Sequence, residues 1–160
     1  MSEALSLGAA VAVTIAVVTD LRRRRIPNWL TGGALGVGLL GGLWLGGPSG
    51  GLSALAGAAL GLLMLLPFYA AGGMGAGDVK LLAAVGALLG PQALLPVAFY
   101  GALSGAVLSL VVMARRGALA HAAQRLSLGK LPGTSGAKAP YAVAIASGVY
   151  LALLFPVVLV

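Results

Sequence analysis

The chain has no cysteine and very few charged residues. Only 8% of its 160 residues are charged, whereas soluble domains carry roughly 25%. With 60% hydrophobic residues and a mean hydropathy of +1.06, the composition indicates an integral membrane protein. The missing cysteines exclude disulfides, thiolate metal sites and thiol catalysis. The single histidine, His121, argues against a histidine-rich metal site, so we expect no metal and no other cofactor.

Acidic residues are also scarce: there are three, against ten Lys and Arg, which gives a net charge of +7. In so apolar a chain, we interpret this excess as a topology signal rather than as a nucleic-acid footprint. The apolar runs are continuous and do not alternate, which favours a helical bundle over a barrel. The sequence therefore predicts an all-α, polytopic membrane protein with about six spans. Residues 1–160 would form a single membrane-embedded domain.

The first apolar run, residues 4–19, differs from a secretory signal peptide in the order of its charges. A signal peptide has positive charge before its apolar core. Here Glu3 precedes the run, and four arginines follow it at positions 22–25. This order predicts a retained helix whose N-terminus lies outside and whose arginines lie in the cytoplasm.

The later apolar runs predict five more spans, at about residues 29–45, 52–70, 79–89, 92–113 and 140–157. Pro27 prevents simple continuation of the first helix, and Asn28 is a plausible N-cap for the second. Gly57 and Gly61 would allow close helix packing in the third. Turns are expected at residues 46–50 and at Gly90-Pro91, since an uninterrupted helix over residues 79–114 would be about 54 Å long.

The distribution of basic residues orients these spans. With the N-terminus outside, all ten Lys and Arg fall on the inner side, which predicts six spans with both termini outside. The longest inner loop, residues 115–139, could include a short interfacial helix around Leu119, His121 and Leu126. The span at residues 79–89 would be only about 17 Å long. Either this span continues to Pro96, or the loop before it dips below the membrane surface, and we favour the dip because irregular backbone can line a wet cavity at that depth.

The only two aspartates, Asp20 and Asp78, both fall at span boundaries on the predicted cytoplasmic side. Asp78 lies in a glycine-rich stretch, residues 72–80, in which Gly75 and Gly77 let the backbone approach a ligand. Two facing carboxylates can share a proton, so that one acts as general base on a water and the other as general acid toward a carbonyl. A peptide bond is the usual target of such a pair, and two acidic ligands are too few for a two-metal site.

Each of these residues also has a structural interpretation. Asp20 could be a helix-end charge paired with an arginine, and Asp78 could be an N-cap. Lys80 is two residues from Asp78 and does not share its helix face, so it fits an interfacial anchor better than a proton donor. The arginines at 22–25 fit topology signals and contacts with anionic lipids.

Three blocks of the sequence resemble one known family. Gly75-Ala76-Gly77-Asp78 is the GxGD signature of polytopic aspartyl proteases, and residues 73–84 resemble the type IV prepilin peptidase family in particular. Asp20 followed by Arg25-Ile26-Pro27-Asn28 resembles that family's first catalytic aspartate and its downstream stretch. Residues 138–146 resemble the last span of the short members that serve Flp/Tad pili.

The resemblance implies an inner-membrane aspartic endopeptidase that removes the short basic leader of prepilins at the cytoplasmic face, just before the substrate's hydrophobic helix. Asp20 and Asp78 would be catalytic, Gly75 and Gly77 would shape the active-site loop, and Lys80 and Asn28 are possible supporting residues. The partners would be prepilin leaders with their N-terminal helices and membrane lipids, with no nucleic acid and an oligomeric state left open.

Larger relatives carry a cytoplasmic insert with paired cysteines that is linked to N-methylation of the new N-terminus. This chain has neither the cysteines nor room for the insert, so we expect peptidase activity only. Two alternatives remain open at this point. One is a GxGD protease for another leader-bearing substrate, such as a preflagellin. The other is a non-enzymatic membrane component, either a scaffold of a pilus or secretion system or a small transporter.

Overall fold

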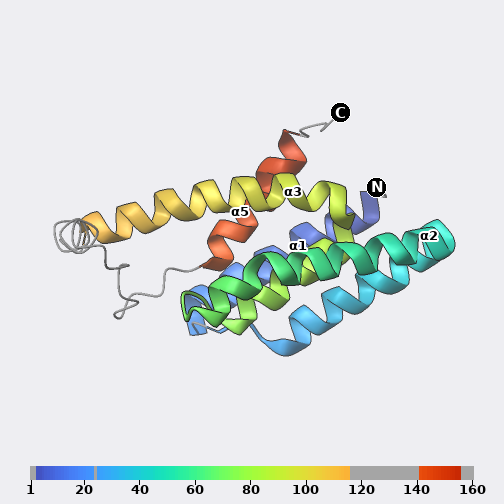
Figure 1. Ribbon diagram of the computed structural model, residues 1–160, viewed down its shortest axis with the longest axis horizontal. Coiled ribbons are helices and arrows are strands. Elements are labelled where there is room, and N and C mark those ends of the chain that lie inside the picture. The colour runs from blue at the N-terminus through green and yellow to red at the C-terminus, as the bar shows by residue number, and fades with distance from the viewer. Residues whose placement is uncertain (1–2, 24, 116–140, 156–160) are drawn as a thin grey trace.

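The computed structural model describes residues 3–23, 25–115 and 141–155, and all of its regular structure in these ranges is helical (Figure 1). The helices are α1 (Glu3–Arg23), α2 (Asn28–Ala70), α3 (Ala76–Arg115) and α5 (Tyr141–Leu154). The expected all-α class is thereby confirmed. Within these ranges, α1, α2 and α3 are long and apolar enough to cross a membrane. The number of six spans and their orientation stay predictions, and the basic loop at residues 116–139 lies outside the described residues.

Both long helices are interrupted at a glycine with positive φ. The break in α2 is at Gly47 (φ 60°) and the break in α3 is at Gly90 (φ 78°), inside the two turns that the sequence predicted. In each case a proline follows, which lacks the N–H that would continue the helix and is well suited to start the next one. At each break the chain folds back, so that α2 and α3 each consist of two packed arms (Figure 1).

The first arm of α3, residues 76–89, forms the centre of the molecule. Every residue from 81 to 89 is buried, so this segment has no face left for lipid. A helix that is apolar all round is expected to be surrounded by other elements. The cluster of buried side chains around it includes Val13 of α1, Leu30 of α2, Val97 of the second arm of α3 and Val149 of α5.

Small residues bring α2 against this central arm. A Cβ added at Gly57 would collide with the backbone of Gly86, and one added at Gly61 would collide with the backbone of Leu82. Both glycines are buried, which confirms the close helix packing predicted for them.

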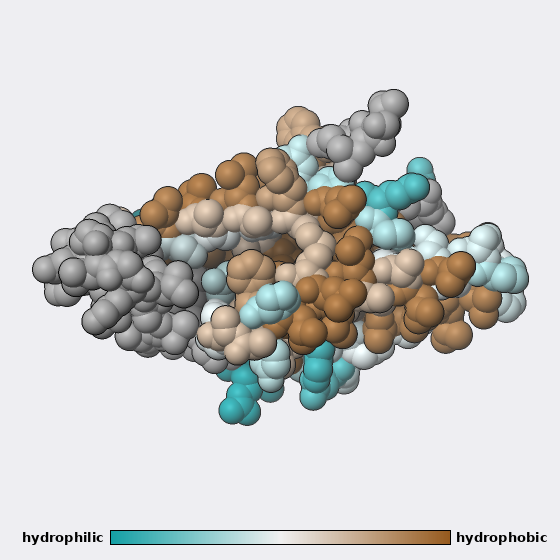
Figure 2. Space-filling model, viewed as in Figure 1, coloured by the Kyte–Doolittle hydropathy of each residue, from teal (hydrophilic) through white to brown (hydrophobic). Residues whose placement is uncertain are grey.

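The outer surface is apolar, as expected for a protein surrounded by lipid. Figure 2 shows brown, hydrophobic side chains along the flanks of the helices, and Trp44 and Leu154 are 89% and 71% exposed. An apolar surface of this extent is not stable in water. Hydroxyl groups connect the helices at two places: the exposed Thr14 of α1 and Tyr150 of α5 share a hydrogen bond of 2.6 Å, and the part-buried Ser147 of α5 donates one of 2.6 Å to Ser104 of α3.

Candidate functional site

The glycine-rich stretch closes one helix and opens the next. The N–H of Gly72 (φ 76°) donates to the carbonyl of Tyr69, and the N–H of Gly73 donates to that of Phe68, both at 2.9 Å. This pair of bonds is a Schellman motif, in which a left-handed glycine ends a helix and satisfies its last carbonyls. Met74 follows and is buried. The stretch is therefore a pair of helix termini joined by a short link in which only Met74 is buried.

Asp78 lies in the first turn of α3, not at its N-cap. Because α3 begins at Ala76, the cap position belongs to Gly75 and Asp78 is the third helical residue, so the interpretation of Asp78 as the N-cap is wrong. Its Oδ2 accepts a hydrogen bond of 3.1 Å from the backbone N–H of Gly75. An acidic residue at this position that reaches back to the cap N–H is one half of a capping box. A Cβ at Gly75 would lie 3.2 Å from the same Oδ2, so the glycine leaves room for the carboxylate.

Asp78 is buried, at 9% exposure, and it stands at the start of the central helix. Apart from Thr31, it is the only buried polar or charged side chain among the described residues. A carboxylate is costly to bury in an apolar bundle, and intramembrane ionisable groups are by default candidates for function. The backbone N–H of Gly75 gives this carboxylate one hydrogen-bond donor at the start of the helix.

Asp20 lies in the last turn of α1 and is half-buried. The chain then passes through Ile26 to the start of α2, and this connection packs against the start of α3. A Cβ added at Gly77 would lie 3.1 Å from the Cβ of Ile26, so these backbones approach closely. The structure therefore places Asp20 and Asp78 at the same end of the bundle, where α1 ends and α3 begins (Figure 1).

The two proposed supporting residues contact each other across this junction. The Nζ of Lys80 donates a hydrogen bond of 3.1 Å to the Oδ1 of Asn28, which joins the fifth residue of α3 to the first residue of α2. The prediction that Asn28 caps α2 is wrong. Pro27 holds the cap position in an extended conformation without a side-chain cap bond, and Asn28 is the first helical residue. Its amide is therefore available to Lys80.

Sequence reasoning missed the role of Ile26. It was named only as part of a motif, yet it is the residue on which Gly77 packs. Its position directly before Pro27 was a usable signal, because a residue before proline is held extended and projects its side chain from a fixed backbone.

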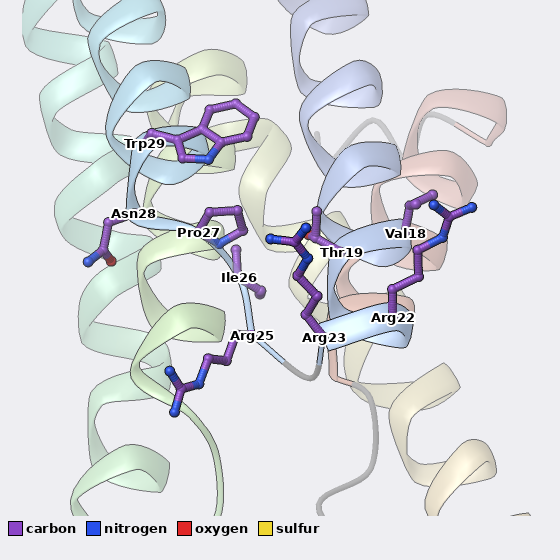
Figure 3. A pocket seen from close by; sticks show the side chains of 9 residues that line it. All are labelled: Val18, Thr19, Arg22, Arg23, Arg25, Ile26, Pro27, Asn28 and Trp29. Atoms are coloured by element: carbon purple, nitrogen blue, oxygen red, sulfur yellow. The ribbon is translucent and has the colours of Figure 1, made fainter.

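A cavity of about 740 Å³ opens at the end of α1, next to this junction (Figure 3). The described residues that line it are Val18, Thr19, Arg22, Arg23, Arg25, Ile26, Pro27, Asn28 and Trp29. Neither aspartate is among them. The described part of the chain holds no group of three or more His, Cys, Asp or Glu side chains placed to bind a metal ion.

These features define a helical membrane protein with a carboxylate buried at the start of its central helix and a second one at the same end. Comparison with family models matches residues 7–110 to the type IV leader peptidase family. The chain belongs to that family, and its membership identifies it as a protease. Both aspartates lie within the matched residues. Comparisons with curated proteins and with solved structures found no match.

Proposed function

We propose that this protein is an aspartic endopeptidase that removes the short basic leader from Flp/Tad-like prepilins, with Asp20 and Asp78 as its catalytic pair. One observation carries the proposal. The residues matched to a leader peptidase family include both aspartates of the chain, and one of them is buried where an apolar bundle would otherwise exclude it.

The chemistry follows from two carboxylates that share one proton. The ionised carboxylate accepts a proton from water, and the water oxygen attacks the carbonyl carbon of the scissile peptide bond. The protonated carboxyl group donates its proton to the carbonyl oxygen. Proton transfer to the amide nitrogen then lets the C–N bond break, which releases a carboxylic acid and an amine. The N–H of Gly75 fixes Oδ2 of Asp78 in orientation throughout.

The proposed access route is from the cytoplasm, at the inner membrane. All ten basic residues fall on one side if the chain crosses six times with both termini outside, and that side carries both aspartates. The first arm of α3, residues 76–89, would be only about 21 Å long. A bilayer core is about 30 Å thick. Asp78 would then lie below the membrane surface, where the hydrophobic helix of a prepilin can remain in lipid while its leader enters.

A transporter is less consistent with how the hydroxyl groups are used. Ser147 donates to Ser104, whose own hydroxyl donates to the carbonyl of Tyr100 in the same helix. Thr14 bonds to Ala10 and Tyr150. Among the described residues, these hydroxyl groups are engaged in contacts within and between helices, which does not favour a continuous polar path for transport.

The test is co-expression with candidate prepilins, scored by the loss of leader mass. We expect cleavage of Flp/Tad-like prepilins, no methylation of the new N-terminus, and little cleavage of a preflagellin. Cleavage of the preflagellin alone would assign the protein to the other substrate. Absence of cleavage of every leader-bearing substrate, with the protein inserted at normal level, would contradict the peptidase assignment.

A further inference from the structure

Neither aspartate lines the cavity at the end of α1, although Ile26 and Asn28 of the neighbouring junction do. Its volume of about 740 Å³ is nevertheless within the range of about 300–1,000 Å³ that small-molecule sites occupy. Its lining comes from the last turn of α1, the connection after it and the first residues of α2.

The cavity is positively charged. Arg22, Arg23 and Arg25 all line it, and none of its nine lining residues is acidic. Figure 3 shows Arg23 extending from the end of α1 toward Pro27, while Arg22 turns back beside Val18 and Arg25 points the opposite way. Arginine binds phosphate groups especially well, because its planar guanidinium can donate two parallel hydrogen bonds.

The remaining walls are mostly apolar. Val18, Ile26, Pro27 and Trp29 contribute hydrocarbon and indole surface, and Trp29 is 68% exposed. The cavity lies where the apolar part of α1 gives way to arginines, which by hydropathy is a boundary between lipid and water. Tryptophan is enriched at this depth in membrane proteins.

We propose that this cavity binds one anionic phospholipid, with its phosphodiester headgroup at Arg23 and with the upper part of its acyl chains against Val18 and Trp29. The occupant must be anionic because the lining is cationic, and it must be amphipathic because the other walls are apolar. A free phosphate would leave those walls in contact with water. A basic leader peptide would be repelled by three arginines. The proposal is independent of the peptidase assignment.

Trp29 provides a direct probe, because the chain has only one other tryptophan, Trp44, which is 89% exposed near the opposite end of the same arm of α2. In the full-length Trp44→Phe protein, reconstituted in mixed vesicles, fluorescence of Trp29 is quenched by lipids with brominated acyl chains. Titration with brominated phosphatidylglycerol or brominated phosphatidylcholine gives the relative binding constant of the two headgroups at this position.

We expect phosphatidylglycerol to be preferred on the order of tenfold, and Arg23→Gln to reduce the preference about fivefold, the equivalent of about 1 kcal/mol per basic residue. Arg23→Lys should restore part of it, since lysine keeps the charge but not the planar fork. Arg115→Gln, at the end of α3, is the matched control and should change nothing.

Three results would overturn the proposal. Equal quenching by the two lipids in the Trp44→Phe protein would exclude a headgroup site without reliance on any arginine variant. An equal effect of Arg115→Gln would assign the preference to the general field of a basic face. Displacement by millimolar inorganic phosphate, at constant ionic strength, would make the cavity a phosphate site and not a lipid site.

Discussion

Substitution of Gly77 tests the junction that holds the two aspartates at one end of the bundle. Gly77 is helical, and a Cβ there would lie 3.1 Å from Cβ of Ile26 and 3.5 Å from its Cγ1. Carbon atoms prefer separations of about 3.5–4.0 Å. Ile26 must therefore move by several tenths of an ångström to accept alanine, and by more to accept valine.

The expected effects on stability and on activity differ. Overpacking costs about 1–3 kcal/mol, and the gain in helix propensity on replacing glycine by alanine offsets at most about 1 kcal/mol of it. Gly77→Ala should therefore lower the unfolding free energy by between about 0 and 3 kcal/mol. A displacement of about 1 Å in an active site can cost about 100-fold in rate. Gly77→Val, which displaces the connection beside Asp78, should lose about tenfold or more in leader removal.

The assay is the rate of leader removal from a prepilin in proteoliposomes, with thermal unfolding of the same samples as the measure of stability. Gly33→Val is the matched control, because Gly33 is exposed on α2 and a Cβ there meets nothing within 4 Å. If Gly77→Val cleaved as fast as Gly33→Val at equal protein level, the close contact with Ile26 would have no part in the site.

Three further predictions follow from the same junction and from the predicted topology. Gly75→Ala should slow cleavage several-fold with little effect on protein level, because its Cβ would crowd Oδ2 of Asp78; unchanged cleavage would contradict this. Asn28→Ala and Lys80→Ala should each slow cleavage only a few-fold, because each removes the same exposed hydrogen bond. A double-mutant cycle on the unfolding free energy should give a coupling of about 0.5–1.5 kcal/mol between the two residues. Strictly additive effects would show that this hydrogen bond contributes nothing to stability. Single cysteines introduced into this cysteine-free chain test the six-span topology. An impermeant thiol reagent should label positions 2, 49 and 160 in intact cells, and positions 76 and 127 only after permeabilisation. Labelling of position 127 from outside would contradict six spans.

The positions of the helix breaks could be predicted from the sequence because they depend on local chemistry. Gly47 and Gly90 each precede a proline, and that pair determines where a helix stops whatever surrounds it. The close packing of Gly57 was also predictable from small-residue spacing. The central location of residues 76–89 was not identified, although an apolar segment without a polar face was a signal for it.

The details of the site depended on contacts between distant segments, and these were not predictable. Asparagine is a residue type favoured at N-caps, yet Pro27 takes the cap position, and the side-chain oxygen of Asn28 accepts a hydrogen bond from Lys80 instead. The N-cap interpretation placed Asp78 three positions too early in its helix, because glycines at 75 and 77 made the helix start ambiguous. The contact of Ile26 with Gly77 exists only because two helix ends meet.

The most direct measurement of the central claim compares asparagine and alanine at the two aspartates. Asparagine at position 78 can still accept the hydrogen bond from Gly75, so Asp78→Asn keeps the helix start and removes only the proton chemistry. Asp78→Ala should in addition lose about 1–3 kcal/mol of stability. In proteoliposomes with a prepilin, Asp20→Asn and Asp78→Asn should each abolish leader removal while the protein stays folded and inserted. Near-normal cleavage by either asparagine variant would contradict the assignment of that aspartate as catalytic.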